Sequence, residues 1–475
     1  MKLDIVYLND VHGYLESHAE LFYDGSNEFI ENAGGYARIS TLKSKMMKSN
    51  PNLLLFDGGD TFHGTLPLVE SKGQAIIPLL NKMEFTAMVG HWDFAYGPKQ
   101  LLHLTSQLNY PMLGINIYNE DGTLFLKPYS IIGIEDIKVA VIGICSDIID
   151  KTMPKNFSEG LTITNGAKEL PKYIKTVKEQ GADIILLLSH NGFPQDMAML
   201  ATIPGIDVCL SAHTHNRLYE TIKVNNTLVI QCGCHGSFLG HLQLDIQQKK
   251  IVSHNYQLIK VEESIAEDPE IKEIVTEIML PYYNIKNTVR GKTATILHRY
   301  NTINSSADAL LLAAIQFISN TEIAFSNGWR YGAPIAAGAI TDWDLYNLIP
   351  MNPPVSTVEL LGSEIMEMLE ENLERTFSPQ PLTQMGGYVK RAIGLHVNMR
   401  IENPKGNRIQ QIFIGNEPLD KKKYYKTSFV TSQGVPTKYG KNRKELPVNA
   451  VTAMIEYLQI NPEFNGTALN IFSLV

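Results

Sequence analysis

The chain has 475 residues, of which 44% are hydrophobic and 19% charged, so it is long enough for two or three domains with apolar cores. Its 41 basic and 49 acidic residues give a formal net charge of -8, which disfavours a nucleic-acid polymer as partner because such partners select a basic surface. No segment approaches the roughly 18 uninterrupted apolar residues of a membrane-spanning helix, so no membrane partner is expected.

The N-terminal residues and the cysteines predict a cytoplasmic protein. Lys2 is followed closely by Asp4, and the apolar run Ile5–Leu8 is too short for the hydrophobic region of a secretory signal. Apolar residues surround the cysteines, as is typical of reduced core thiols and not of a disulfide framework. They are Cys145, Cys209, Cys232 and Cys234.

Short apolar runs alternate with amphipathic segments in the first half of the chain, which favours a layered α/β domain. The runs predicted as strands are Leu3–Leu8, Asn52–Phe56, Thr86–Val89, Lys138–Ile144, Asp183–Leu188 and Asp207–Leu210. The segments predicted as helices are Ala37–Met47, Gln74–Met83, Pro98–Gln107, Thr164–Gln180 and Pro194–Ala201. Two later runs, Thr227–Gly233 and Leu239–Ile246, are predicted to pair with each other and complete the domain.

The pattern changes near Ile259. The charged stretch Glu262–Tyr283 is predicted as a linking helix that begins at Glu267-Asp268-Pro269, because proline suits a first helical turn. A second domain is expected from about Gly291. Its predicted elements are helices at Ser305–Ser319, Gly362–Phe377 and Ala450–Leu458 and a β-rich region at Ala392–Phe429.

Aspartate or histidine follows five of the apolar runs. Taken singly, such residues are ordinary turn residues, helix caps or hydrogen-bonded structural histidines. Functional groups gather at one end of the strands in α/β domains, however, so five such motifs together predict a metal site of carboxylates and imidazoles. The motifs are Asn9-Asp10-Val11-His12-Gly13, Asp57-Gly58-Gly59-Asp60, Gly90-His91-Trp92-Asp93-Phe94-Ala95-Tyr96-Gly97, Ser189-His190-Asn191-Gly192 and Ser211-Ala212-His213-Thr214-His215.

In this order the motifs resemble those of the calcineurin-like metallophosphoesterases, and specifically the 5′-nucleotidase branch. That branch carries Asp-x-His, Gly-Gly-Asp, Gly-Asn-His-Glu-Phe-Asp-Tyr-Gly, His and Gly-His-x-His. The second half also resembles the branch's C-terminal domain, at Ser326–Gly332, Gly338–Thr341 and Leu360–Glu364. The resemblance implies a four-layer α/β/β/α metallophosphoesterase domain over residues 1–260, a linking helix at 261–290 and a C-terminal α+β substrate-binding domain at 291–475.

The same resemblance implies a pair of divalent metal ions, Mn or Zn, bound by two sets of ligands. One ion would be held by Asp10, His12, Asp60 and His215. The other would be held by Asp60, His91, His190 and His213, with Asp60 as the bridge. A hydroxide between the ions would attack a small anionic phosphate ester, such as a nucleotide, in the cleft between the domains.

Three of the differences between the third motif and the family pattern matter for the chemistry. The asparagine ligand is replaced by His91, the substrate-facing histidine by Trp92, and the aspartate that orients that histidine by Ala95. Trp92 therefore belongs to the expected catalytic residues although it cannot carry a proton. Asp93 is a candidate for the missing acid–base function, with a helix cap as the alternative.

This variant motif resembles that of the sulfur-oxidation thiosulfohydrolases, which hydrolyse a sulfate group from a carrier cysteine. Trp329-Arg330-Tyr331-Gly332 also resembles their Arg-Trp-Gly element, whereas the nucleotidases' Gly-Gly-Asp-Gly-Tyr loop is not found at Thr431–Pro436. Asn327, Arg330 and Tyr331 are the candidates for substrate binding, with a surface ion pair as the alternative for Arg330. His63 is expected to pack or cap, and His235 and His241 to be structural.

Three hypotheses follow. The first is a dimetal hydrolase of phosphate esters, and the second a thiosulfohydrolase-like enzyme that cleaves an S-sulfonate or a sulfate ester. The third, a non-catalytic binding protein, is disfavoured because the complete ligand set is retained.

Overall fold

The computed structural model describes residues 1–466 and 471–475, so residues 467–470 of the predicted C-terminal domain lie outside the described part. Contacts divide the chain into two compact units. The first unit comprises Met1–His18 and Asn32–Leu280, and the second comprises Ala19–Glu31 and Pro281–Val475. No helix in the described residues is both long and apolar enough to cross a membrane.

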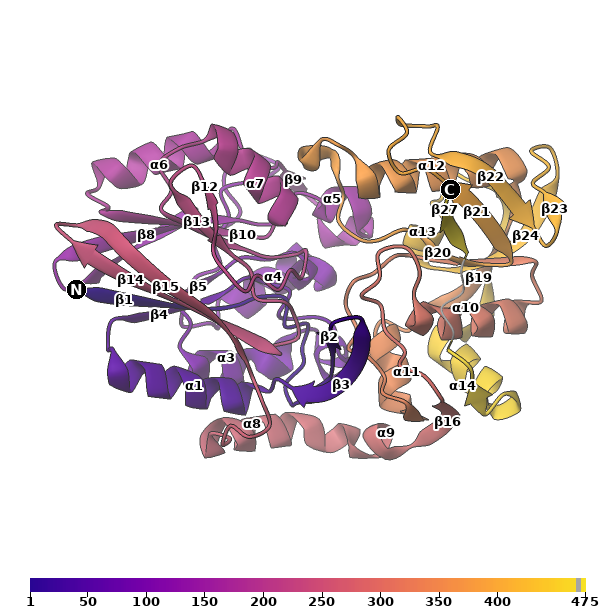
Figure 1. Cartoon of the computed structure of the whole chain (residues 1–475), viewed down its shortest axis with the longest axis horizontal. Helices are drawn as coiled ribbons and strands as arrows, with labels where there is room; N and C mark the ends of the chain where they lie inside the picture. The colour runs from indigo at the N-terminus through magenta and orange to yellow at the C-terminus, as the bar shows by residue number, and fades with distance from the viewer. Residues whose placement is uncertain (467–470) are drawn as a thin grey trace. The chain divides into compact units, whose positions relative to one another are not determined.

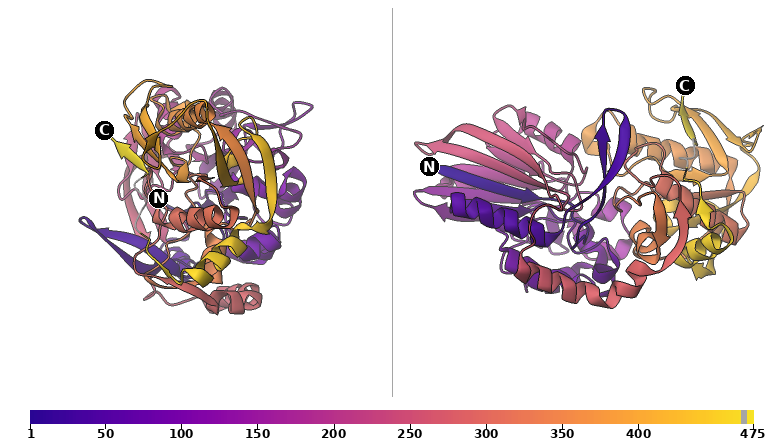
Figure 2. Two further views of the ribbon diagram at one scale, coloured as in Figure 1. Left: turned by 90° about the vertical axis from the view of Figure 1, so that its right-hand side faces the viewer. Right: turned by 60° about the horizontal axis from the view of Figure 1, so that its bottom comes forward.

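The first unit is built from two sheets between layers of helices, which confirms the predicted α/β architecture (Figure 1). One sheet has the strand order β15-β14-β1-β4-β5, and the other has the order β12-β13-β11-β10-β8-β7. Helices α1 and α3 cover the outer face of the first sheet, and α6 and α7 cover that of the second (Figure 1). The right-hand view of Figure 2 shows β1, in indigo, running among the strands of its sheet.

Eight of the following strands of the first unit match predicted runs, and the five at residues 117–119, 129–134, 161–163, 222–224 and 250–260 were not predicted. The strands are β1 (Lys2–Leu8), β4 (Leu53–Asp57), β5 (Ala87–Met88), β6 (Ile117–Asn119), β7 (Tyr129–Ile134), β8 (Ile137–Ile144), β9 (Leu161–Ile163), β10 (Ile184–Ser189), β11 (Val208–Ser211), β12 (Ile222–Val224), β13 (Thr227–Ile230), β14 (Phe238–Gln247) and β15 (Lys250–Lys260). The helices are α1 (Tyr36–Ser49), α2 (Leu66–Glu70), α3 (Ile77–Met83), α4 (Pro98–Thr105), α5 (Ile149–Thr152), α6 (Leu170–Glu179), α7 (Phe193–Thr202) and α8 (Pro269–Met279), with 3₁₀ helices η1 (Gln74–Ile76), η2 (Trp92–Tyr96) and η3 (Lys155–Phe157).

Helix α6 shows how the amphipathic pattern builds a layer. Its buried side chains Leu170, Ile174 and Val177 recur at helical spacing and pack in one apolar cluster with residues of β8 and β10. The helix begins later than the predicted Thr164, because Gly166 has a left-handed φ of 78° and Pro171 suits a first turn.

One predicted pairing is wrong. The runs Thr227–Gly233 and Leu239–Ile246 do not pair with each other, because β13 pairs with β11 and β12 whereas β14 pairs with β1 and β15. The chain crosses from one sheet to the other between these strands, and the crossing brings His235 to the strand ends described below. A run of alternating residues indicates a strand but does not indicate which sheet it joins.

The second unit combines several sheets with helices and is α+β, as expected. Its strands are β16 (Val289–Thr293), β17 (Ile323–Ser326), β18 (Gly338–Thr341), β19 (Pro354–Leu361), β20 (Arg391–Ile393), β21 (Leu395–Met399), β22 (Ile409–Ile414), β23 (Glu417–Pro418), β24 (Tyr424–Val430), β25 (Lys441–Asn449), β26 (Glu463–Phe464) and β27 (Phe472–Leu474). The helices are α9 (Tyr283–Asn287), α10 (Ser306–Ser319), α11 (Asp342–Leu348), α12 (Gly362–Phe377), α13 (Thr431–Gly434) and α14 (Ala450–Ile460), with 3₁₀ helices η4 (Leu280–Tyr282) and η5 (Pro381–Thr383). One sheet has the order β20-β17-β24-β19-β25.

Two features near the unit boundary differ from the sequence-based picture. The predicted linking helix begins where expected, with the Asp268 side chain accepting from the Glu270 N–H at 3.0 Å, but α8 ends at Met279, two residues before Pro281. A hairpin of β2 (His18–Asp24) and β3 (Asn27–Ala33) was not predicted, and residues 19–31 of it group with the second unit.

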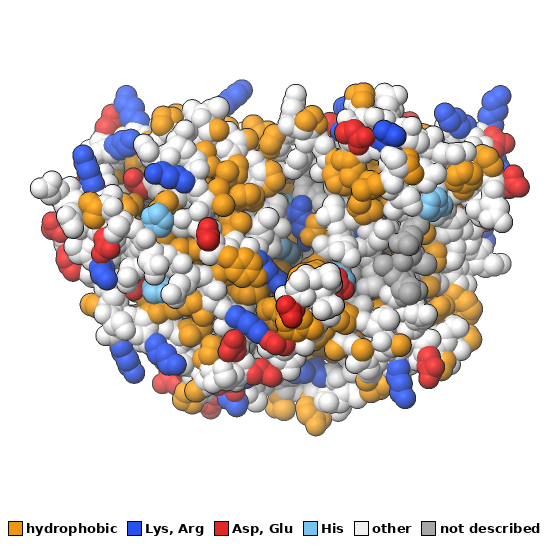
Figure 3. Space-filling model, viewed as in Figure 1, with side chains coloured by type: hydrophobic (Ala, Val, Ile, Leu, Met, Phe, Trp, Pro, Cys, Tyr) orange, Lys and Arg blue, Asp and Glu red, His pale blue; other side chains and the backbone are white. Residues whose placement is uncertain are grey.

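Charges of both signs are interspersed on the face of the molecule shown in Figure 3. No large field of acidic side chains is seen among the described residues on this face.

Candidate metal centre

The candidate ligands lie where parallel strands of both sheets end. Strand β1 pairs with β4 in parallel, with Leu8 level with Asp57, and β10 pairs with β11 in parallel, with Ser189 level with Ser211. The side chains that follow these strands are thereby brought to common edges. The Tyr7 hydroxyl donates to the Ser211 carbonyl at 2.8 Å and so ties the end of one sheet to the end of the other.

Backbone hydrogen bonds continue the β1–β4 ladder into the first two motifs. The Asp10 N–H donates to Gly59 O at 3.0 Å, and the His12 N–H donates to Asp60 O at 2.7 Å. Asp10, His12 and Asp60 all have φ between 51° and 59°, in the left-handed region that side-chain-bearing residues seldom occupy. Such strain persists where surrounding contacts impose it, and it clusters at functional sites.

Glycine is required at position 59 of the second motif. Its φ is 87°, and a Cβ atom there would lie 2.5 Å from Val89 O. The strand that precedes His91 therefore passes directly against the turn that presents Asp60, and only a residue without a side chain fits between them.

The structure brings all seven predicted metal ligands together, in two groups that share Asp60. In each group the candidate ligand atoms all lie within 4.8 Å of one another. The groups are Asp60, His91, His190 and His213, and Asp10, His12, Asp60 and His215. These are the same two sets that the family resemblance implies.

Asp60 lies between the two groups. Its Oδ2 atom is 3.4 Å from His12 Nε2 and 3.4 Å from His190 Nε2, and its Oδ1 atom is 3.6 Å from His91 Nδ1. Burial alone would raise the pKa of Asp60, but His190, His12 and His91 together lower it well below its ordinary value. The carboxylate therefore stays ionised, which a bridging role requires.

The orientation of His190 leaves one ring nitrogen facing the carboxylates. Its Nδ1 lies 2.5 Å from Gly58 O, and because a carbonyl only accepts, this nitrogen carries the proton. Nε2 then points towards Asp10 and Asp60. Burial alone would lower the pKa of His190, but those two carboxylates raise it to about 10, so the field at Nε2 favours a cation.

Buried ring nitrogens support the same interpretation. Among the described residues, neither ring nitrogen of His91 has a hydrogen-bond partner, and neither does His190 Nε2. Elsewhere His12 Nε2 faces His215 Nε2 at 3.2 Å. Buried polar atoms rarely lack partners, and carboxylates with imidazoles suit Mn²⁺ or Zn²⁺, so this set fits divalent metal ions.

Asp93, predicted to act in acid–base chemistry or as a helix cap, binds the backbone of the second motif. Its carboxylate accepts from the N–H groups of Asp60, Thr61 and Phe62 at 2.8 to 2.9 Å and from that of His91 at 3.2 Å. Burial and the nearby Asp60 raise its pKa. Through these hydrogen bonds, Asp93 holds the turn that presents Asp60 in place.

Asp93→Asn is therefore expected to lower the free energy of unfolding by about 1–3 kcal/mol, because an amide NH₂ would face backbone donors and leave some of them unpaired. Urea denaturation would measure the change. The matched control is Asp136→Asn, an exposed residue before β8, for which a change within about 0.5 kcal/mol is expected. Equal stability of Asp93→Asn and the wild type would contradict the assigned contacts.

Trp92 lies beside the shared carboxylate. Its backbone N–H donates to Asp60 Oδ1 at 2.6 Å. Its ring stacks on that of His63, with centroids 4.8 Å apart and planes 22° apart, and lies 6.0 Å from the ring of His91. His63 thus packs against Trp92, in agreement with the expectation that it packs or caps.

Two supporting residues had no predicted role at the site. Asn9 donates to Gly233 O at 2.7 Å and accepts from the Cys232 N–H at 2.9 Å, which fastens the sheet crossing to the end of β1. The ring of His235, expected to be structural, lies 6.0 Å from that of His12 and 6.2 Å from that of His215. A histidine in a Gly-rich crossing between sheets was the only sequence signal for this position.

The predicted substrate-binding residues follow β17 in the second unit. Tyr331 is buried, and its carbonyl accepts from Arg299 Nη1 at 3.1 Å. The half-buried Arg330 donates from Nη2 to Gly387 O at 3.2 Å, and its guanidinium lies 5.2 Å from the centre of the Tyr388 ring. Asn327 is half-buried on the same loop.

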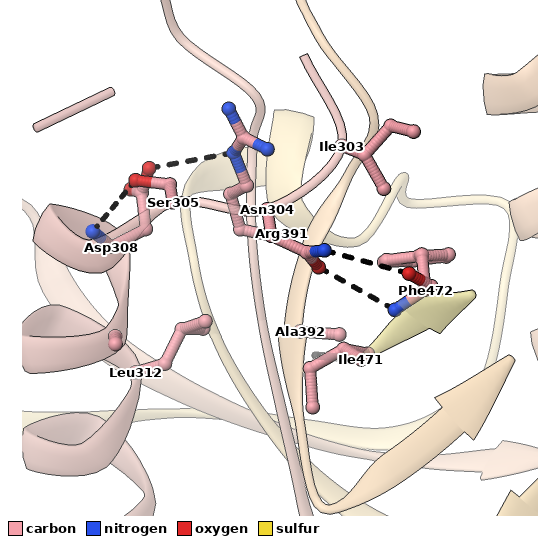
Figure 4. A pocket seen from close by; sticks show the side chains of 10 residues that line it. Ile303, Asn304, Ser305, Asp308, Leu312, Arg391, Ala392, Ile471 and Phe472 are labelled. Atoms are coloured by element: carbon pink, nitrogen blue, oxygen red, sulfur yellow. Dashed lines mark hydrogen bonds and ion pairs between the residues drawn. The ribbon is translucent and has the colours of Figure 1, made fainter. Parts of the chain in front are cut away.

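A separate small pocket lies in the second unit at the start of α10 (Figure 4). Arg391 and Asp308 form an ion pair there at 3.5 Å, and the Asn304 side-chain amide donates a hydrogen bond to the Phe472 carbonyl. None of the predicted substrate-binding residues lines this pocket.

Comparisons with known proteins agree with this geometry. Residues 3–217 match the calcineurin-like phosphoesterase family, and residues 284–432 match the 5′-nucleotidase C-terminal domain. The chain therefore combines a calcineurin-like phosphoesterase domain with a 5′-nucleotidase C-terminal domain. Phosphoesterases and 5′-nucleotidases are hydrolases, and this chain is a hydrolase of the same class.

Individual relatives are distant in sequence and similar in fold. The chain is 24% identical to a snake venom 5′-nucleotidase from Naja atra, over 91% of this chain and 90% of that protein. It is also 24% identical to a 5′-nucleotidase from Bos taurus, over 97% and 89% of the two chains.

Among solved structures, a Thermus thermophilus sulfate thiohydrolase SoxB has a TM-score of 0.93 at 22% identity, covering 100% of this chain and 96% of that one. A 5′-nucleotidase precursor, also from Thermus thermophilus, has a TM-score of 0.88 at 20% identity, covering 100% and 99%.

Proposed function

We propose that this protein is a dinuclear metal-dependent hydrolase that cleaves an ester of phosphate in a small anionic molecule. The observation that carries the proposal is the sharing of Asp60 by two groups of candidate ligands, since one carboxylate can serve two cations through its two oxygens. Asp10, His12, Asp60 and His215 would hold one ion, and Asp60, His91, His190 and His213 the other. Mn²⁺ and Zn²⁺ fit this mixed set of oxygen and nitrogen ligands.

When bound, the ions would lower the pKa of a water nucleophile and neutralise charge on the ester oxygens. The protein's own part is to fix the ligands. The Gly58 carbonyl orients His190, and the Asp93 carboxylate holds the turn that presents Asp60. We further propose that Arg330, with Asn327 and Tyr331, binds the substrate anion, because an arginine fork matches phosphate or sulfate oxygens.

A second candidate reaction is the hydrolysis of an S-sulfonate or a sulfate ester. The observation that favours it is the stacked Trp92 and His63 pair beside His91, in the motif where the chain resembles the thiosulfohydrolases. The fold similarity to SoxB is compatible with this reaction but does not select it over phosphate-ester cleavage.

The experiment that separates these reactions is a substrate screen on protein stripped of metal and reloaded with Mn²⁺ or Zn²⁺. Phosphate release from 4-nitrophenyl phosphate or nucleoside 5′-monophosphates supports the first reaction, and sulfate release from an S-sulfonated cysteine peptide supports the second. Equal rates for stripped and reloaded protein would reject a metal-dependent hydrolase.

Metal binding is also expected to stabilise the protein. At an ion concentration 100 times the dissociation constant, one bound ion contributes about 2.7 kcal/mol, which corresponds to a rise in Tm of several degrees. Thermal unfolding of stripped protein with increasing Mn²⁺ would measure the rise, and elemental analysis is expected to find two ions per chain. A Tm that does not respond to either metal would contradict the proposed site.

A further inference from the structure

The side chain of Trp92 forms an aromatic wall beside one of the two ligand groups. The bond from its backbone N–H to Asp60 Oδ1 fixes the start of η2 at the shared carboxylate. Its ring lies 6.0 Å from that of His91 and meets the ring of Phe157 edge-on, with centroids 6.0 Å apart and planes 72° apart. An indole N–H can donate a hydrogen bond, but it does not ionise in the pH range in which proteins are folded.

Three ionisable residues lie on η2 or against its tryptophan ring, and each is buried or hydrogen-bonded to the backbone: His63, Asp93 and Tyr96. His63 is fully buried under the stacked Trp92 ring, and burial lowers its pKa to about 4. The carboxylate of Asp93 is occupied by backbone N–H groups. The Tyr96 hydroxyl donates to Leu68 O at 2.9 Å, and burial raises its pKa.

The chemistry of ester cleavage makes this arrangement selective. A hydroxide forms a new bond to phosphorus or sulfur, and the bond to the leaving group breaks, with its electron pair departing on the leaving atom. An alkoxide needs a proton as it departs, and a positioned acid typically contributes about 10²–10⁴-fold to such a step. A thiolate or phenolate, whose conjugate acids have pKa values of about 8.5 and 10, departs as an anion and takes its proton from water afterwards.

We propose that this enzyme selects esters whose leaving group is acidic, such as a thiol or a phenol, over alkyl esters such as nucleoside 5′-monophosphates. The inference rests on the proposed hydrolase function and narrows its substrate class. Trp92 is the specificity-determining residue, because its ring lies beside that of the candidate ligand His91 and cannot protonate an alkoxide.

The wild-type protein loaded with Mn²⁺ tests this directly. We expect kcat/KM to fall steeply from 4-nitrophenyl phosphate through phenyl phosphate to an alkyl phosphate, and an S-aryl phosphorothioate to be cleaved readily. Values of kcat/KM for the nitrophenyl and alkyl esters within about tenfold would overturn the inference, because a general acid is worth more than that. If a residue on another element, such as His235, donated the proton, the kcat/KM values of the nitrophenyl and alkyl esters would likewise be similar.

The variants use the geometry of η2. Residues three apart in a 3₁₀ helix lie one above the other, so a carboxylate introduced at position 95 would contact a histidine introduced at position 92. The double variant Trp92→His/Ala95→Asp is expected to reduce the ratio of nitrophenyl to alkyl kcat/KM by about 10²-fold. The matched control, Trp92→Phe, keeps an aromatic ring without an ionisable group and is expected to retain the steep dependence.

Metal content, measured by elemental analysis, is the readout that does not depend on activity. Two ions per chain in all variants with a reduced ratio only in the double variant supports the inference, whereas the same reduction in Trp92→Phe overturns it. No turnover of any ester by metal-loaded wild-type protein overturns both the inference and the proposed function. Turnover without discrimination between leaving groups overturns the inference alone.

Discussion

Asp60→Asn is expected to lower metal-dependent hydrolysis by about 10³-fold or more, because the amide removes the negative charge that both ligand groups share. The carboxylate lies within 3.6 Å of a ring nitrogen of each of His12, His91 and His190, and no second residue in the described part of the chain belongs to both groups. Initial rates on an activated aryl phosphate, with metal content measured on the same samples, would quantify the loss.

A buried aspartate remote from the ligand groups provides the control. Asp4 lies near the start of β1 and accepts from Gln243 at 3.1 Å, about 20 Å of strand away from Asp10. Asp4→Asn is expected to keep its metal and its rate within a few-fold. If Asp60→Asn retained two ions per chain and full activity, Asp60 would not be the bridge and the dinuclear assignment would be wrong.

The two groups of candidate ligands could be predicted from the sequence, because each ligand belongs to a short motif of neighbouring residues. An apolar run followed by Asp10 or His190 indicates both a strand and the side chain at its end, and parallel strands then bring those ends to one edge. The order of the motifs along the chain then indicated the family resemblance, from which the two ligand sets were assigned. The matched family models confirm this resemblance. The domain boundaries at residues 260 and 290 and the cytoplasmic location stay predictions.

Features that depend on long-range contacts could not be predicted in the same way. The partner sheet of β14 is set by its contacts with β1, some 240 residues away, and not by its own pattern. The carboxylate of Asp93 is a candidate acid in the sequence, and only the fold shows it bound to the backbone at Asp60. The packing of His235 against His12 likewise follows from the crossing between sheets.

In the second unit, Asp308→Ala is expected to lower the free energy of unfolding by about 3–5 kcal/mol, because it leaves buried arginine charge without its carboxylate. Arg299 is fully buried and donates to Asp308 from Nε at 3.2 Å and from Nη2 at 3.0 Å. Arg391 Nε lies 3.5 Å from the same carboxylate, and burial already lowers the pKa of Arg391 to about 10. Urea denaturation would measure the loss.

The control variant for the effect of burial is Glu179→Ala. It removes an exposed ion pair with Lys175, whose side chain is 78% exposed. Water screens that pair, so its loss is expected to cost less than about 0.5 kcal/mol. Arg299 also donates to the Tyr331 carbonyl, on the loop that carries Arg330, so Asp308→Ala is expected to weaken substrate binding as well as stability. A normal KM in a destabilised Asp308→Ala protein would show that the ion pair supports the fold and not the position of Arg330.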